Sequence, residues 1–172
     1  MADESLADRL NRLAQQQKEQ HEAETHVQKT QEQVNEFILK NASPEFQRLL
    51  DIVGKKVEQV NPSLLALPLF EWRRNGAILK QGNVAAFFSF HQAFTNAGPI
   101  LFHVSFGREP DGFYLEGFSE PPEPERYQLH AAMAHEPERI LWAGDLGEMS
   151  SETLADFVLT HLTEYYLCHK PI

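Results

Sequence analysis

Hydrophobic residues in the first 43 positions fall, with interruptions, on positions spaced three and four residues apart, which is the spacing of one face of an α-helix. No glycine or proline interrupts this segment, whereas the rest of the chain contains all nine glycines and all ten prolines. The pattern therefore predicts one long helix over residues 1–43. Its apolar positions form a sparse stripe of candidate partner-binding residues: Leu6, Leu10, Leu13, Val27, Val34 and Ile38.

The middle of this stripe is polar. Four of its positions at heptad spacing carry residues that a stable two-stranded coiled coil would replace with leucine or isoleucine. They are Gln17, Gln20, Glu24 and Gln31. We expect a conditional helix that is anchored near residues 34–39 and ordered further out when something packs against its leucines. The alternative is a helix that frays before residue 25 and only docks its end on its own domain.

A second helix is predicted from about residue 44 to residue 60. Ser43 is a good N-cap and Pro44 suits the first helical turn, so the sequence predicts a break at residues 41–44. Apolar residues then recur on one face: Phe46, Leu49, Leu50, Val53 and Val57. The predicted organisation is a helical extension, residues 1–43, followed by a single α+β domain, residues 44–172.

From residue 68 the apolar period changes from helical to two, which is typical of β-strands. Turn residues separate five predicted strands, at residues 69–74, 77–81, 84–94, 100–107 and 113–118. Asn75-Gly76 is typical of a two-residue type I′ turn, in which both residues have positive φ. The result is a five-stranded antiparallel meander, with a possible sixth strand at residues 139–143.

Side-chain alternation fixes the predicted register, because a slip of one residue would expose the core face. The first turn pairs Trp72 with Leu79, and a turn centred on residue 97 pairs Phe88 with Phe106. The predicted core face contains Phe70, Trp72, Leu79, Ala86, Phe88, Phe90, Phe102, Val104, Phe106, Phe113 and Leu115.

The C-terminal part of the chain follows an acidic, proline-rich linker at residues 119–124. Residues 127–135 fit either a helix or a strand. A last helix begins at Ser150 or Ser151, and its apolar face is expected to cover the phenylalanine-rich side of the sheet. That face carries Leu154, Phe157, Val158, His161, Leu162 and Tyr165.

The opposite face of the sheet is polar and holds the candidate ligand site. The register sets His91 opposite His103, and directly opposed residues have Cβ atoms about 4.5 to 5.5 Å apart. Two imidazoles and one carboxylate form a known metal set, although histidines and serines also occur on ordinary polar sheet faces. The candidate residues are Ser89, His91, His103, Ser105, Tyr114 and Glu116.

Charge and cysteine content narrow the classes of partner. The formal net charge of -10 disfavours nucleic acid and anionic membrane surfaces. Residues 109–148 carry ten acids against two arginines, which indicates a solvated face or a dock for a basic partner. Cys168 is the only cysteine, so no intrachain disulfide forms. With no apolar run of about 18 residues, we expect a cytoplasmic protein.

Motifs for nucleotide-phosphate binding, zinc hydrolysis and serine hydrolysis are absent from the sequence, which removes any specific case for an enzyme or a cofactor. The plan of a small, acidic, helix-flanked antiparallel sheet resembles that of bacterial secretion chaperones. We therefore expect a non-enzymatic protein-binding or chaperone-like module that self-associates or holds a protein partner. The alternative is a small-molecule or metal-binding domain, conceivably an enzyme, built on the polar face around His91 and His103.

Overall fold

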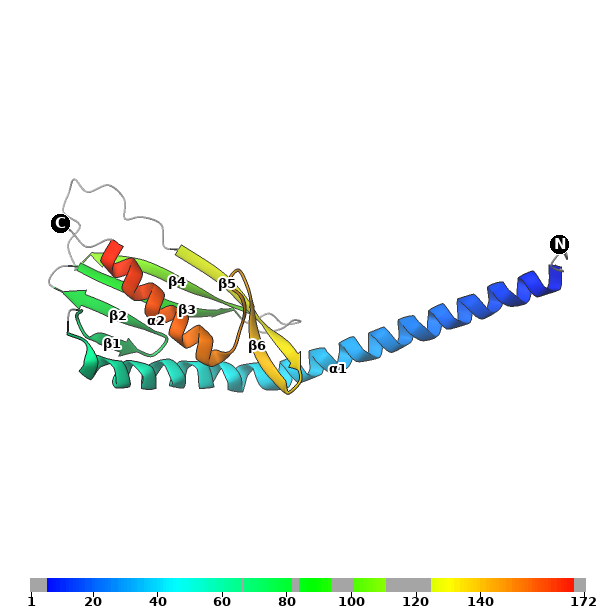
Figure 1. The fold of residues 1–172 in the computed structure, drawn as a ribbon, viewed down its shortest axis with the longest axis horizontal. Helices are drawn as coiled ribbons and strands as arrows, with labels where there is room; N and C mark the ends of the chain where they lie inside the picture. The colour runs from blue at the N-terminus through cyan, green and yellow to red at the C-terminus, as the bar shows by residue number, and fades with distance from the viewer. Residues whose placement is uncertain (1–5, 66, 82–83, 94–100, 111–124, 169–172) are drawn as a thin grey trace. The chain divides into compact units, whose positions relative to one another are not determined.

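The computed structural model describes residues 6–65, 67–81, 84–93, 101–110 and 125–168 (Figure 1). The chain divides into two compact units, residues 1–37 and residues 38–172. Helix α1, Leu6–Val60, contributes to both units, and a short 3₁₀ turn, Asn61–Ser63, follows it. The second unit also contains an antiparallel sheet and helix α2, Ser151–Cys168. The fold class is therefore α+β, as predicted.

The predicted break at residues 41–44 is wrong, because Pro44 lies inside α1. An internal proline loses a backbone hydrogen bond and costs about 3 kcal/mol. Burial offsets that cost: Ile38, Ala42 and Phe46 are 7%, 0% and 4% exposed, and Val53 is completely buried. The buried residues before and after Pro44 lie on the same face of the helix, so α1 continues past the proline.

Seven strands form the sheet, and they lie side by side in the order in which they occur in the chain. Their bounds are β1 Phe70–Arg73, β2 Gly76–Gln81, β3 Val84–Ala93, β4 Leu101–Pro110, β5 Glu125–His135, β6 Glu138–Gly144 and β7 Gly147–Met149. The antiparallel meander is confirmed, but the count exceeds the five or six strands expected. Residues 127–135, which fitted either a helix or a strand, belong to β5, and the predicted strand at residues 139–143 is β6.

The predicted register between β3 and β4 is confirmed. Phe88 lies opposite Phe106, and His91 lies opposite His103. Alternation on both strands favours this pairing, because it buries Phe88, Phe90, Phe102 and Phe106 on the same side.

The first hairpin differs from the prediction. Its turn residues are 74 and 75, so Trp72 pairs with Ala77. No described residue other than glycine has a positive φ, which excludes a type I′ turn at these positions. Gly76 instead permits a close approach, since a Cβ there would lie 2.0 Å from the carbonyl oxygen of Phe88.

The neighbour of β4 on its second side is β5, which pairs with every residue from Leu101 to Phe106. The meander expected from the sequence would have placed residues 113–118 beside β4 at these positions, and β5 lies there instead. The predicted strand at residues 113–118 itself lies outside the described residues. Alternation within a strand identifies its inner face and does not identify its neighbour.

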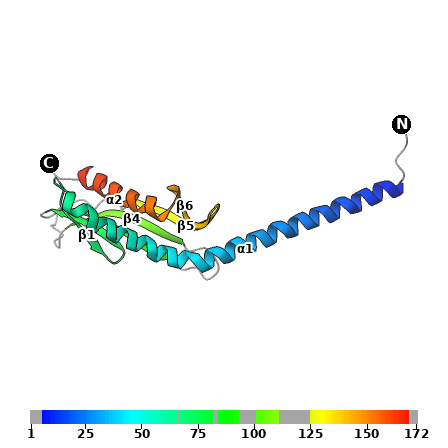
Figure 2. The ribbon, with the colours of Figure 1, turned by 60° about the horizontal axis from the view of Figure 1, so that its bottom comes forward.

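The phenylalanine-rich face forms the core, and two helices cover it where one was predicted (Figures 1 and 2). From α1, the ring of Phe46 lies 5.0 Å from that of Phe102 and 6.2 Å from that of Trp142, measured between centroids. From α2, Phe157 meets the edge of Phe106 at 6.4 Å. The C-terminal part of α1 is thus a core element of the second unit.

A buried serine joins the sheet to both helices. Ser151, 1% exposed, accepts a hydrogen bond from Trp142 Nε1 at 2.9 Å and donates one to Glu45 Oε1 at 2.6 Å. Ser150 is the N-cap of α2, because its hydroxyl accepts the Thr153 N–H at 3.2 Å. The two adjacent serines therefore have separate roles, one as a core hydrogen-bonding group and one as a cap.

The exposed edge of β1 is partly closed by a side chain. Asn61 Nδ2 donates to the carbonyl oxygen of Phe70 at 2.9 Å, and its Oδ1 accepts the Phe70 N–H at 2.8 Å. This amide takes the place of a neighbouring strand, which reduces the tendency of the edge to pair with another chain.

Candidate functional site

The N-terminal unit, residues 6–37 of α1, exposes most of the predicted stripe. Leu6, Leu10 and Leu13 are 73%, 57% and 50% exposed, and Val27 is 66% exposed. Val34 is half-buried. Ile38 belongs to the core of the second unit, so the stripe that is open to a partner ends before it.

Polar contacts along the same helix are local. Gln15 Nε2 donates to Glu19 Oε1 at 2.8 Å, and Lys18 lies 3.9 Å from Glu22. Pairs of this kind contribute about 0.2 to 0.5 kcal/mol each. No described side chain in residues 6–37 is buried, so this unit has no hydrophobic core of its own. A helix with exposed leucines and no core is a candidate for binding another surface.

The polar sheet face brings four of its six predicted residues together. The imidazoles of His91 and His103 are stacked, with centroids 4.9 Å apart and planes inclined by 20°. Ser89 Oγ lies 2.6 Å from His91 Nε2, and Ser89 faces Ser105, which is 5% exposed. The predicted cross-strand pairs are confirmed, whereas their role as a ligand site stays a prediction.

The two remaining predicted residues, Tyr114 and Glu116, lie outside the described residues. The strand that flanks β4 here is β5, and it places Gln128 opposite His103 and Arg126 opposite Ser105. The β5 residues opposite His103 and Ser105 therefore carry an amide and a guanidinium. Sequence reasoning missed both because it chose the wrong neighbour for β4.

Electrostatics at this face favour neutral imidazole. Burial lowers the pKa of His103, and the positive charges of His91 and Arg126 lower it further. A shared metal would need ring nitrogens from both histidines about 2.0 to 2.1 Å from one point, and stacked rings do not direct their lone pairs that way. Among the described residues, no group of three or more histidine, cysteine or acidic side chains is arranged to hold a metal.

The histidine on α2 packs against an aromatic ring and lies next to a carboxylate. His161 stacks on Phe157 with centroids 5.3 Å apart, and its Nε2 lies 2.7 Å from Glu125 Oε2. Tyr127 shares that carboxylate, and its pKa is raised by burial, by the charge of Glu125 and by their hydrogen bond. The surrounding aromatic rings contact one another, so this cluster packs the edge of the core.

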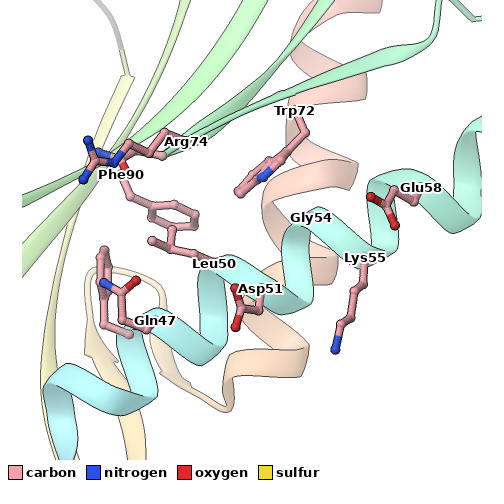
Figure 3. Close-up of a pocket in the computed structure, with 11 residues that line it drawn as sticks. Gln47, Leu50, Asp51, Gly54, Lys55, Glu58, Trp72, Arg74 and Phe90 are labelled. Atoms are coloured by element: carbon pink, nitrogen blue, oxygen red, sulfur yellow. The ribbon is translucent and has the colours of Figure 1, made fainter.

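A cleft of 580 Å³ lies between α1 and the β1–β2 hairpin (Figure 3). Its apolar wall includes Leu50 and Phe90, and Trp72 reaches over Gly54, where a Cβ would lie 3.1 Å from the indole nitrogen. Polar side chains line the rest: Gln47, Asp51, Lys55, Glu58, Arg74 and Asn75. Sequence reasoning did not find this cleft, because its residues come from segments about 20 positions apart. A glycine within the helix was the one local sign.

No protein-family model, curated protein or solved structure matches this chain. Among the described residues, no helix combines the length and apolar character of a membrane span. Function therefore has to be inferred from the surfaces of the chain itself.

Proposed function

We propose that this protein is a non-enzymatic protein-binding or chaperone-like module that self-associates or holds a protein partner through residues 6–37 of α1. The observation that carries the proposal is the exposure of Leu6, Leu10 and Leu13 at helical spacing. Protein partners are proposed here, with no nucleic acid, membrane or cofactor, and the proposed location is the cytoplasm.

The energetics support association. Fully burying one leucine side chain stabilises a structure by about 1.5 to 3 kcal/mol, and three leucines lie within two turns of this helix. The helix has no core of its own, and isolated helices of moderate propensity are marginally stable in water. A partner surface would therefore order the helix and bury the leucines in one step.

A leucine-to-serine variant tests the proposal in the full chain. Replacing Leu6, Leu10 and Leu13 with serine should reduce the mass found by light scattering to that of one chain. Deletion of residues 1–36 should give the same result, since the second unit has its own core. A matched control replaces Lys18, exposed on the outer face of the helix, with serine. An unchanged mass in both the leucine variant and the deletion would refute self-association through this helix.

Ligand binding at the polar sheet face is a second candidate function. Two adjacent rows of side chains cross β3, β4 and β5 on this face. Each of these side chains can donate a hydrogen bond when the histidines are protonated, which favours ligand binding. They are Ser89, His91, His103, Ser105, Arg126 and Gln128. In a chain of net charge -10, this group of hydrogen-bond donors suits a small anion.

Calorimetry with inorganic phosphate would test this second function. Because the pKa of His103 is lowered, tighter binding than at pH 8 is expected only well below the ordinary histidine pKa of about 6.5, where the His103 imidazole gains a proton and attracts an anion. Replacing His91 and His103 with alanine should abolish the binding. His135→Ala, at the exposed end of β5, is the matched control. Undiminished binding by the double variant would remove the polar face as the site.

A further inference from the structure

We infer that the N-terminal helices of two copies of this chain pair in parallel and in register, as a two-stranded coiled coil over residues 6–34. This inference rests on the proposed self-association and adds the identity and direction of the partner. It is carried by the positions of polar and apolar residues within one heptad frame and by their exposure.

The frame follows from the alternating spacing of three and four residues along the stripe. Its a positions are Leu10, Gln17, Glu24 and Gln31. Its d positions are Leu6, Leu13, Gln20, Val27 and Val34. All nine lie on a continuous α-helix, and none is buried within its own chain.

Charge distribution on the helix independently marks this stripe as a seam. Within residues 6–37 only Glu24 lies at a core position, and only Arg9 lies beside the core. The other eight charged residues all occupy the outer positions b, c and f: Asp8, Arg12, Lys18, Glu19, Glu22, Lys29, Glu32 and Glu36. Apart from Arg9, the positions that flank the core hold residues without a formal charge at pH 7, three of which are alanines: Ala7, Ala14 and Ala23. This side of the helix can therefore approach another helix without like-charge repulsion at the rim.

A layer of a coiled coil is a pair of core residues, one from each helix, that face each other. The parallel, in-register alignment is the one that gives the most apolar layers. In it every core residue meets its own counterpart, so five layers are apolar, those of Leu6, Leu10, Leu13, Val27 and Val34. The four polar layers also pair like with like. A shift of one heptad sets Leu10 against Gln17 and leaves two apolar layers, those joining residues 6 with 13 and 27 with 34.

Antiparallel alignments match less well. An antiparallel coil sets a positions against d positions, and within residues 6–37 no such alignment gives more than two apolar layers. The best-overlapping one sets Leu10 against Val34 at both ends and Leu13 against Gln31. It would gain further layers only from Ile38, which is buried in the core of the second unit.

The polar layers make this association specific and weak. Matched polar residues in a coiled-coil core define register at a cost in stability. The Glu24 layer is the least favourable because it brings two carboxylates together. Glu24→Leu should therefore tighten the association by about tenfold or more, since each 1.4 kcal/mol changes a dissociation constant tenfold.

Cysteine cross-linking in the full chain tests direction and register. Cys168, the only natural cysteine and an exposed one, is first replaced with serine. Gln31→Cys in that background should form an interchain disulfide quickly on oxidation, because the two side chains share a layer. The matched control Lys29→Cys, on the outer face, should not. Light scattering is expected to give the mass of two chains.

The other outcomes separate this inference from the proposed function. A two-chain mass with no Gln31→Cys disulfide, or with cross-links between Gln31→Cys and Leu13→Cys copies, would overturn the parallel geometry and leave self-association standing. A mass above two chains would overturn the two-stranded coil. A one-chain mass at every concentration, for both the wild type and Glu24→Leu, would overturn the inference together with the proposed self-association.

Discussion

Two parts of helix α1 carry the same kind of apolar stripe with opposite surroundings. In residues 38–60 the stripe is closed off from solvent, with Leu49 and Val53 completely buried against the rest of the second unit. In residues 6–37 the corresponding leucines are at least half exposed. Helical spacing therefore identifies the face of a helix that is suited to packing. A complementary surface has to exist before that face contributes to stability.

The two faces of the sheet repeat this contrast. One is covered by α1 and α2 and is built from tilted and edge-on aromatic rings. The other carries the stacked pair of His91 and His103, which no described helix covers. Covered and uncovered surfaces should respond differently to the same substitution, and four measurements examine this difference.

The largest effect should come from truncating matched leucines in the two parts of α1. Leu49→Ala should lower the free energy of unfolding by about 2 to 5 kcal/mol, because it leaves a cavity in the core. Leu10→Ala should change the unfolding of the second unit by less than about 0.5 kcal/mol while weakening association. Urea denaturation monitored by tryptophan fluorescence measures the first effect, and light scattering measures the second. Equal losses of stability would contradict the contrast between the two parts.

The next largest effect should come from removing the buried hydroxyl of Ser151, which joins the sheet to both helices. Ser151→Ala should cost about 1 to 3 kcal/mol, because the indole N–H of Trp142 and the Glu45 carboxylate lose a buried partner. Ser150→Ala removes only the cap of α2 and should cost about 1 kcal/mol. Denaturation of both variants gives the comparison. A smaller loss for Ser151→Ala than for Ser150→Ala would show that the buried link contributes little.

Replacing Pro44 should restore a backbone hydrogen bond in the buried part of α1. Its effect on the free energy of unfolding should be smaller than that of Ser151→Ala and opposite in sign. Pro44→Ala supplies an N–H to the carbonyl of residue 40 and should raise stability by about 1 kcal/mol, after allowing for the more flexible unfolded chain. Thermal unfolding measures the change. Destabilisation would mean that the proline ring itself packs favourably in α1.

The smallest effect should be a pH dependence from the uncovered face. Because the pKa of His103 is lower in the folded protein, the unfolded chain binds a proton more readily. Stability should therefore be complete above the ordinary histidine pKa of about 6.5 and fall as the pH drops below it. His103→Gln should flatten this part of the profile, and His135→Gln should not. A profile unchanged by His103→Gln would contradict the proposed cause.

Local pattern was sufficient for several features of this protein. The helical character of residues 6–40 and 45–60, the antiparallel meander and the opposition of His91 and His103 all follow from periodicity, which reports the face toward which each side chain points. The same periodicity was sufficient to place Phe88, Phe90 and Phe102 in the core. These properties depend on residues close in sequence or on one long, well-matched pair of strands.

Contacts between residues that are distant in the sequence determined the features that local pattern did not predict. Pro44 stays helical because residues on both sides of it are buried. Residues 131–134, although rich in alanine, belong to β5 and pair with β6. Gly76 is required by the carbonyl of Phe88, which comes from another strand. Arg126 and Gln128 reach the histidines because β5 takes the place expected for residues 113–118. In each case the competing local preference is worth at most a few kcal/mol, and contacts between distant residues outweigh it.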